Sequence, residues 1–551
     1  MATSIPSLGT SHRRCRYDVD GERKSVGQWD HATVEWGTMT RRGRHRRTRA
    51  DGDGGESSSH ITQPPVRLHQ RSFAPTDALS DDHIEAIHHA SLAVLRDIGI
   101  DVLNADARHR LAMEGARIDG ERVRFDPNMV NDFIASAPAQ FTLHARNPQH
   151  NVVMGGDHVV FTSVGSPPNV ADLTNGRRPG NHQDFRQLVR LSHHLNAVQV
   201  HAGYPVEPAD IHASIRHLRA THDLLTLSDK VINGYSLGAE RNRDCLEMVR
   251  IARGVSDEQL DVEPSITTII NTSSPLRLDD PMAQGIIEFA QRGQVSIITP
   301  FTLAGAMAPI TLAGALAQQN AEALAGIVLT QVVKRGAPVV YGGFTSNVDM
   351  RSGSPAFGTP EFMQSALVGG QLARRYQLPY RSSNVNASNA VDTQAGYESV
   401  FSLWGAIMGG ANLIYHGAGW MEGGLQASYE KMIIDADLIQ MVGQFLRPLI
   451  VDDATLAVDA IAEVGPGGHF FGIDHTQQRY REAFFSPMIS DWRNYETWAE
   501  AGAPTAERKA AQLVSALLAE YAQPPMDDDV RAELDAFVEK RVAEGGVSTD
   551  Y

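Results

Sequence analysis

Short runs of β-branched and apolar residues alternate with longer segments from about residue 158 onward, and in the longer segments apolar positions recur every three or four residues. The short runs are typical of buried strands, and the longer segments are typical of amphipathic helices. We predict strands at residues 159–162, 198–201, 231–234, 265–270, 295–298, 338–343, 379–383 and 412–415. We predict helices near residues 182–195, 210–227, 240–252, 280–292, 312–335, 360–376, 393–409 and 428–446.

This alternation of strands and helices implies parallel strands that are joined by right-handed crossovers. Eight such units over residues 158–450 match an α/β fold of the (β/α)8 TIM barrel type, which takes ~250 residues. A doubly wound open sheet is the alternative, but it needs a phosphate-binding glycine fingerprint after its first strand. The chain continues there as Ser163-Val-Gly-Ser-Pro-Pro168, and two prolines do not favour a helix.

The segments on either side of the barrel have patterns of their own. Residues 76–157 predict a helical N-terminal cap, with helices near 80–98, 105–114 and 127–137 and short strands near 122–125 and 141–144. Residues 451–551 predict a mostly helical C-terminal appendage. Residues 1–75 contain a basic run at 41–49 and a Gly/Ser-rich run at 51–59, a composition typical of disorder. We expect order to begin near Leu79. The tail is either a site for an acidic partner or a dispensable extension upstream of a later start such as Met39.

Composition narrows the class of protein. The 551 residues include 42% hydrophobic and 21% charged residues, as in an ordinary globular protein. A net charge of −16 argues against a nucleic-acid or anionic-membrane binder. Two cysteines, Cys15 and Cys245, exclude a disulfide framework. No apolar run approaches the ~20 residues of a membrane span, and no secretory signal is evident, so we expect a cytoplasmic protein.

Polar residues gather where the predicted strands end, and the C-terminal ends of barrel strands are where active sites form. The segment after the seventh strand carries Asn384, Asn386, Asn389, Asp392 and Gln394. The eighth strand runs into a glycine-rich loop that carries His416, Trp420 and Glu422. The alternative for this loop is a plain strand–loop junction with a structural histidine and a packed tryptophan.

Several common chemistries lack their motifs. The chain has no HExxH, no cysteine cluster and no recognised ligand spacing among its histidines, so we expect no metal site. It has no G-x-S-x-G nucleophile elbow and no P-loop. Cys245 lies in a helical pattern beside Leu246 and Met248, where a buried, inert thiol is expected.

Aromatic residues near the strand ends provide another candidate chemistry. The candidates are Tyr341, Phe344, Phe301, Tyr415 and Trp420. Aromatic cages bind quaternary ammonium groups by cation–π attraction, worth ~0.5–2 kcal/mol per contact. Glu422 or Asp392 would add charge complementarity. The alternative for each ring is packing in the barrel interior.

Four runs carry a resemblance to a known family. They are Ala337-Pro-Val-Val-Tyr-Gly342, Asp392-Thr-Gln-Ala-Gly-Tyr-Glu398, His416-Gly-Ala-Gly-Trp-Met-Glu-Gly-Gly-Leu425 and Gly467-Gly-His-Phe-Phe-Gly-Ile-Asp-His-Thr476. In this order, and over roughly residues 75–520, the chain resembles the trimethylamine methyltransferase (MttB) superfamily. The resemblance implies a (β/α)8 barrel and methyl transfer from a methylated amine to cobalt. It implies that the corrinoid cofactor (cobalamin) belongs to a separate corrinoid protein, which docks over the barrel mouth.

One departure from the family pattern bears on the substrate. The trimethylamine enzymes carry pyrrolysine just before the Asp-x-Gln-Ala motif, where this chain has Val385. Members that lack pyrrolysine use quaternary amines such as glycine betaine, whose nitrogen is already cationic and needs no activation. The resemblance therefore implies a glycine betaine-like donor. The alternatives are a methyltransferase for trimethylamine, for another methylated amine or for a sulfonium donor, and a non-catalytic barrel that binds quaternary amines.

We assign roles on this basis. We expect His416, Glu422 and Asp392 to be catalytic, with His416 contacting the carboxylate or polar end of the substrate. The expected substrate-binding residues are Trp420, Tyr341, Phe344, Tyr415, Asn384, Asn386, Asn389 and Gln394. We expect a homo-oligomer that binds neither nucleic acid nor membrane.

Overall fold

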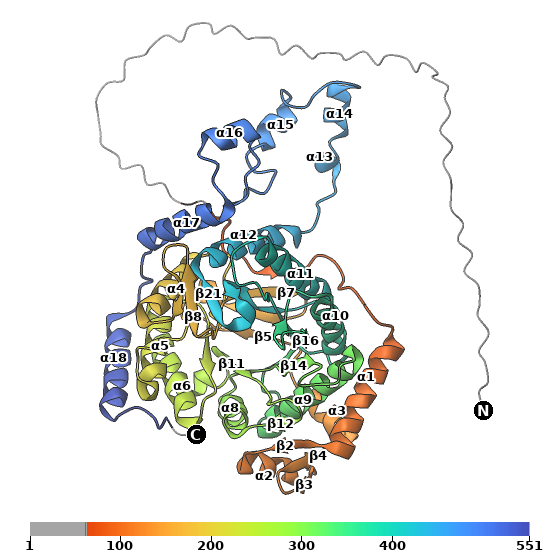
Figure 1. The fold of residues 1–551 in the computed structure, drawn as a ribbon, viewed down its shortest axis with the longest axis vertical. Helices are drawn as coiled ribbons and strands as arrows, with labels where there is room; N and C mark the ends of the chain where they lie inside the picture. The colour runs from red at the N-terminus through yellow and green to blue at the C-terminus, as the bar shows by residue number, and fades with distance from the viewer. Residues whose placement is uncertain (1–60, 62, 550–551) are drawn as a thin grey trace, which may run out of the picture. The chain divides into compact units, whose positions relative to one another are not determined.

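A ring of parallel strands forms the centre of the computed structural model, which describes residue 61 and residues 63–549 (Figure 1). The neighbouring strands are, in order, β7 (His158–Ser163), β19 (Leu413–Ala418), β18 (Tyr380–Ser383), β15 (Val339–Gly342), β13 (Val295–Ile298), β11 (Ile266–Ile270) and β10 (Ile232–Tyr235). Val200 closes the ring, because it forms parallel bridges to Thr162 in β7 and to Val231 just before β10. The predicted (β/α)8 TIM barrel is therefore confirmed.

The second barrel position differs from the prediction of a strand at residues 198–201. Only Val200 bridges to both neighbours. The side chain of Gln199 takes over part of the ladder, because its Oε1 accepts the backbone N–H of Phe161 at 3.0 Å. A side chain that replaces a backbone acceptor shortens the strand.

All eight predicted barrel helices are present among the described residues. They are α4 (His182–His194), α5 (Ala213–Leu227), α6 (Ala239–Arg253), α8 (Asp280–Gln291), α9 (Leu312–Val333), α10 (Pro360–Arg375), α11 (Thr393–Gly409) and α12 (Tyr429–Phe445). A short helix, α7 (Asp257–Leu260), follows α6. Asn181, Thr359 and Asp392 cap α4, α10 and α11, each accepting a backbone N–H of the first turn.

The N-terminal region covers one end of the barrel with helices and short strands. The helices are α1 (Asp81–Ala93), η1 (Val94–Ile98), α2 (Ala105–Met113), α3 (Pro127–Ala135) and η2 (Pro148–His150). One sheet joins β3 (Arg117–Asp119), β4 (Arg122–Arg124), β2 (Ile100–Val102) and β12 (Arg277–Leu278). The hairpin of β5 (Gln140–Leu143) and β6 (Val152–Gly155) places Leu143 and Met154 in one apolar cluster with Val160, Val200 and Val340 of the barrel interior. The interior is thus filled at the N-terminal ends of the strands.

Ordered backbone begins before Leu79, the residue at which we expected it. β1 (His69–Gln70) pairs antiparallel with β7. Arg71 follows it and forms an ion pair of 3.0 Å with Asp157. Pairing with a strand about ninety residues away leaves no local signal in the sequence. The basic and Gly/Ser-rich runs of the expected 1–75 tail lie outside the described residues.

Two small sheets extend the barrel at the C-terminal ends of its strands. One contains β20 (Trp420–Met421), β21 (Gln426–Ser428), β8 (Asn169–Asp172) and β9 (Gly176–Pro179), with the turn η3 (Glu422–Gly424) between β20 and β21. The other contains β14 (Phe301–Ala304), β16 (Phe344–Val348) and β17 (Pro355–Ala356). These sheets form the walls around the barrel mouth.

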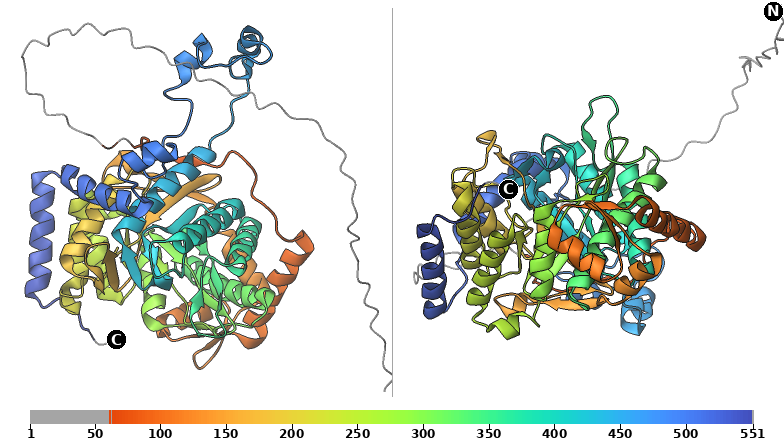
Figure 2. Two further views of the ribbon diagram at one scale, coloured as in Figure 1. Left: turned by 45° about the horizontal axis from the view of Figure 1, so that its top comes forward. Right: turned by 90° about the horizontal axis from the view of Figure 1, so that it is seen from below.

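The C-terminal appendage is helical, as expected. It contains α13 (Asp453–Leu456), α14 (Val458–Val464), α15 (Asp474–Arg479), α16 (Tyr495–Glu500), α17 (Ala506–Glu520) and α18 (Asp528–Ala543). α17 packs against α12 and α4, and α18 lies beside α5 and α6 (Figure 2). The helices α13 to α15 stand away from the barrel (Figure 1). In the described part of the chain, no helix combines the length and apolar character that crossing a membrane requires.

Candidate active site

A cavity of about 210 Å³ lies at the C-terminal ends of the barrel strands. The residues around it come from seven barrel positions, from α8 and from the segment that contains β20 and η3; they are Gly165, Ser166, Tyr235, Ser236, Ile269, Asn271, Met282, Thr299, Phe301, Phe344, Arg381, Tyr415, His416, Trp420 and Gly424. Ser166 and Asn271 are exposed, whereas Arg381 and Tyr415 are buried. The cavity therefore opens at the strand ends and has its closed end inside the barrel. Its volume suits a small ligand, since drug-sized ligands occupy pockets of ~300–1,000 Å³.

The end of β19 bulges and carries His416 into the cavity wall. The pairing of β19 with β7 shifts register between Ile414 and Ala418. Inside this bulge His416 has a φ of 55°, a left-handed conformation that is uncommon for residues other than glycine. Its backbone N–H donates to Thr162 Oγ1 at 3.1 Å. A strained, non-glycine conformation at a cavity wall is typical of functional sites.

Aromatic rings form one continuous wall of the cavity. The rings of Phe301 and Phe344 lie 5.3 Å apart, and the imidazole of His416 stacks on Trp420 at 5.2 Å. Phe344 links the two pairs, with its ring 6.4 Å from that of Trp420. Among the expected cage residues, Phe301, Phe344, Tyr415 and Trp420 line the cavity. Such a wall can bind a quaternary ammonium group through cation–π attraction.

Among the described residues, Arg381 on β18 is the one Lys or Arg of the cavity wall, and it was not among the expected site residues. It is 3% exposed, and its guanidinium carbon lies 4.9 Å from the ring centre of Phe344 and 5.0 Å from that of Tyr415. Its Nε has no hydrogen-bond partner in the described structure, and no carboxylate is among the groups that act on its charge. Burial lowers the pKa of Arg381 to about 10, so the guanidinium keeps its charge at neutral pH. Apart from a hydrogen bond of 3.4 Å from its Nη1 to Gly343 O, Arg381 has no anionic partner among the described residues, and a buried cation of this kind can bind an anion.

His416 is a neutral group in this setting. Burial, and after it the charge of Arg381, hold the pKa of His416 well below the ordinary value of histidine. Its Nδ1 has no hydrogen-bond partner among the described residues. A neutral imidazole can offer a hydrogen bond to a ligand but no charge.

The two carboxylates that we expected to be catalytic lie outside the cavity wall. Glu422 accepts two hydrogen bonds from Arg177, at 2.7 and 3.1 Å, and fastens the turn η3 to β9. Asp392 is exposed and caps α11, because its Oδ1 accepts from the backbone N–H of Gln394 and Ala395. In this structure both carboxylates have structural partners.

The loop after β18 holds the expected asparagines in different surroundings. Asn384 is buried and donates to Gly417 O at 2.9 Å, which ties the loop to the bulge of β19. Asn386 is buried and donates to Ser399 Oγ at 2.9 Å. Asn389 is exposed. The side chain of Val385, which the family resemblance assigns to the pyrrolysine position, is fully buried. None of these residues lines the cavity.

A buried carboxylate that we did not predict holds this loop. Glu398 on α11 accepts the backbone N–H of Ala387 at 2.9 Å and that of Ser388 at 3.0 Å. Gln394 donates to the other oxygen of the same carboxylate at 2.8 Å. Gln394, expected to bind substrate, thus acts on the loop through Glu398.

Tyr341 also lies away from the cavity. It is fully buried, and its hydroxyl donates to Asn320 Oδ1 on α9 at 2.9 Å. The ring therefore packs between the barrel and its outer helices. This is the alternative to an aromatic cage that the sequence left open for each ring. In the described residues, no group of three or more His, Cys, Asp or Glu side chains is placed to hold a metal ion.

Comparisons with known proteins identify the family of the chain. The profile of the family described as Trimethylamine methyltransferase (MTTB) matches residues 41–546. The chain is 37% identical over 469 residues to the glycine betaine methyltransferase of Desulfitobacterium hafniense (strain Y51), covering 85% of this chain and 98% of that protein. It is 31% identical over 475 residues to the trimethylamine methyltransferase MttB of Desulfitobacterium hafniense (strain DSM 10664 / DCB-2), covering 85% and 95%. The solved monomethylamine methyltransferase MtmB of Methanosarcina barkeri aligns with a TM-score of 0.48 and 11% identity, over 84% of this chain and 89% of that one.

A barrel with these matches is a methyltransferase. The chain belongs to the trimethylamine methyltransferase (MttB) family, and the resemblance carried by its four sequence motifs is confirmed.

Proposed function

We propose that this methyltransferase takes a methyl group from a quaternary amine that carries a carboxylate, glycine betaine or a close relative, and delivers it to a corrinoid protein. The observation that carries the proposal is Arg381, a buried guanidinium in the cavity without a carboxylate partner among the described residues. A ligand carboxylate would supply the missing partner through a bidentate pair. The relative at 37% identity, a glycine betaine methyltransferase, supports the same substrate class.

The charge of Arg381 also discriminates against trimethylamine. Trimethylamine has no anionic group, and in its protonated form it would bring a second cation next to the guanidinium. Like charges at such distances in a poorly hydrated cavity repel strongly. A zwitterion presents an anion to Arg381 and a cation to the aromatic wall, so both ends of the molecule are complemented.

The remaining residues orient this zwitterion. The wall of Phe301, Phe344 and Trp420 would hold the trimethylammonium group, and neutral His416 would add a hydrogen bond near the carboxylate. A quaternary nitrogen leaves as a neutral amine and needs no proton, so the site does not require an acid beside it. The chain's contribution is to fix the methyl group in position and to exclude water.

A corrinoid carried by a partner protein supplies the nucleophile that accepts the methyl group. The cavity fits this role, because Ser166 and Asn271 mark an exposed rim at the C-terminal ends of the strands. The carboxylate end of the ligand would lie inside the cavity, at Arg381. The methyl group would then face the rim, where a docked partner can reach it.

The test is methyl transfer by the purified full-length chain to free cob(I)alamin, followed through the absorbance of methylcobalamin. The donors are glycine betaine, choline, tetramethylammonium and trimethylamine at equal concentrations. We expect glycine betaine to be the best donor, choline and tetramethylammonium to be poorer because they lack the carboxylate, and trimethylamine to be inactive. Transfer from trimethylamine together with no transfer from glycine betaine would contradict the proposal.

A further inference from the structure

An arm without a core leaves the barrel after α12. We define the arm as residues 449–484, which carry α13, α14 and α15 (Figure 1). In this stretch, all of which the structure describes, Ala460 is the only buried residue. Large apolar side chains are exposed instead, among them Leu449 at 88%, Phe471 at 81% and Phe484 at 84%. Exposed apolar residues at this density mark a surface that binds another protein.

The arm does not stabilise itself. Its three helices have 4, 7 and 6 residues, and helices shorter than ~12 residues are marginal in water without tertiary packing. The hydrogen bonds of the described arm residues join them to one another and not to the barrel. A folded arm therefore needs a partner surface.

A matching apolar surface lies on the barrel of the same chain. Tyr397, Val400 and Trp404 are exposed at one face of α11, at i, i+3 and i+7 spacing, and Met441 and Phe445 are exposed on α12. The rings of Trp404 and Phe445 lie 5.2 Å apart, so the two helices form one stripe. We call these five residues the apolar stripe. It ends at Phe445, four residues before the arm begins.

We propose that the arm of one chain docks on the apolar stripe of a second copy of the same chain, so that two copies exchange arms. In a twofold arrangement each copy supplies one arm and one stripe, so the apolar residues of the arm and of the stripe cover each other. The arm offers enough area for its side of an interface. Ten large apolar side chains of the arm are exposed, and at ~100–200 Å² each they amount to on the order of 1,000 Å², against the ~800 Å² that each partner contributes to a stable interface.

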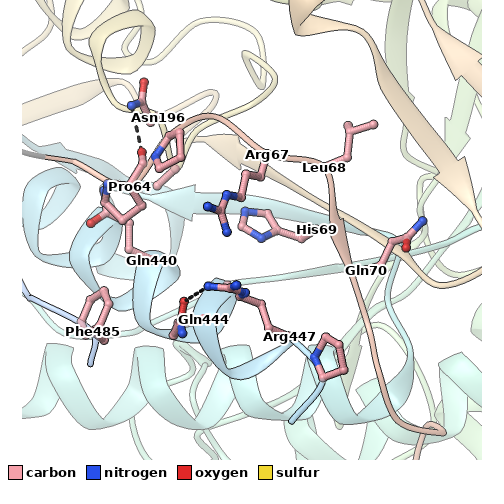
Figure 3. Close-up of a pocket in the computed structure, with 14 residues that line it drawn as sticks. Pro64, Arg67, Leu68, His69, Gln70, Asn196, Gln440, Gln444, Arg447 and Phe485 are labelled. Atoms are coloured by element: carbon pink, nitrogen blue, oxygen red, sulfur yellow. Dashed lines mark hydrogen bonds between the residues drawn. The ribbon is translucent and has the colours of Figure 1, made fainter. Parts of the chain in front are cut away.

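The position of the arm favours a second copy over the corrinoid protein. The arm leaves from the C-terminal end of α12, and barrel helices run antiparallel to the strands, so this end is opposite the mouth. The cavity beside it, of about 260 Å³, confirms the location (Figure 3). Arg447 and Phe485, at the two ends of the arm, line this cavity together with Asn196, which precedes the second barrel position. A corrinoid protein must reach the barrel mouth, whereas the arm leaves the barrel at the opposite end.

Sedimentation velocity of the full-length chain at several micromolar concentrations tests the exchange. The arm variant is F471S/F484S, the stripe variant is V400S/W404S, and the control is V262S, which alters an exposed apolar residue outside both surfaces. We expect the wild type and the control to sediment as dimers or larger assemblies. We expect each double variant to raise the dissociation constant at least tenfold, with unchanged circular dichroism of the barrel.

Mixing the two double variants distinguishes exchange from other contacts. A mixed dimer contains one intact arm and one intact stripe facing each other, so it should assemble more tightly than either variant alone. Contact between arm and arm, or between stripe and stripe, would give no such recovery. A monomeric wild type, an arm variant that assembles like the wild type, or the absence of recovery on mixing would each overturn the proposal.

Discussion

The guanidinium carbon of Arg381 lies 4.9 Å from the centre of the Phe344 ring, on the wall of the barrel cavity. Tyr415 presents its ring to the same guanidinium at 5.0 Å. Two such contacts are worth ~1–4 kcal/mol together, which is less than the several kcal/mol that burying a charge costs. The cavity therefore holds a cation at a net cost, and a bound carboxylate would offset that cost.

Replacing Arg381 with methionine should remove selection for the carboxylate. Truncating one partner of a buried charge pair costs ~2–5 kcal/mol, so we expect the Kd of glycine betaine to rise about 30-fold or more. Tetramethylammonium should bind equally well or better, because the repelling cation is gone. Calorimetric titration of both ligands measures this. A lysine at position 381 keeps the charge and loses the planar fork, so R381K should fall between the two. Equal weakening of both ligands would mean that Arg381 only shapes the cavity.

Replacing Arg381 with methionine should also make the ligand-free protein more stable. A methionine of similar volume replaces an unpaired buried charge, and such replacements stabilise by ~1–4 kcal/mol. We expect the free energy of unfolding of R381M to rise in a denaturant titration. R541M is the matched control, because Arg541 donates to the buried carboxylate of Asp244 at 2.8 and 3.2 Å. Its loss leaves Asp244 with His217 alone and should lower stability by ~1–3 kcal/mol. A fall in stability for R381M would contradict this account.

Periodicity predicts most of the barrel and misses what depends on distant pairing. The eight barrel helices and seven of the barrel strands follow from apolar patterns that are local in sequence. The exceptions are the second barrel position, where the Gln199 side chain displaces part of the ladder, the two small sheets at the barrel mouth, and the pairs of Asp101 and Val102 with Arg277 and Leu278. Those pairs join residues more than 170 positions apart, and two-residue strands carry no pattern.

The sequence predicts those site residues that lie close together on one loop. His416 and Trp420 are four residues apart on the same strand end, and the structure places both on the cavity wall. Glu422 is on the same loop, yet its partner Arg177 comes from β9, which no local pattern reveals. Arg381 had a signal in the sequence, since a charged residue in the middle of a buried strand needs a reason to be there. The roles of all these residues stay predictions.

The left-handed backbone of His416 should determine how substitutions at this position change the stability of the protein. Glycine is relaxed at a φ of 55°, whereas alanine is strained by ~1 kcal/mol, so H416G should be more stable than H416A by that amount. Gln364, which is exposed on α10, is the matched control. There the order should reverse, with Q364A about 1 kcal/mol more stable than Q364G. Thermal unfolding measures both pairs. Both His416 variants should bind glycine betaine more weakly, and unchanged binding would remove His416 from the site.

Two substitutions of Asp392 should show whether this carboxylate caps α11 or takes part in catalysis. Asparagine also caps helices well, so D392N should keep both stability and the rate of methyl transfer. D392A should lose ~1 kcal/mol of stability through the cap while its kcat for glycine betaine stays within about twofold of wild type. A large loss of kcat in D392N, with unchanged stability, would restore the catalytic assignment of this carboxylate.

Protonation of His88 should make the protein less stable at acid pH. His88 is buried against the hydroxyl of Tyr376 at 2.9 Å, and burial, helped by the charge of Arg375, lowers its pKa to about 4. The unfolded chain binds the proton near the ordinary pKa of 6.5, so stability is highest above pH 6.5 and falls as the pH drops toward 4. At ~1.4 kcal/mol per pKa unit, His88 alone should account for about 2 kcal/mol between pH 7.5 and 5. Denaturant titrations of H88N at both pH values should show a pH dependence smaller by this amount. Y376F is the control, because it removes the hydrogen bond without removing the titrating ring, and it should lower stability at both pH values alike. An H88N variant with the full wild-type slope would assign the acid sensitivity to other groups.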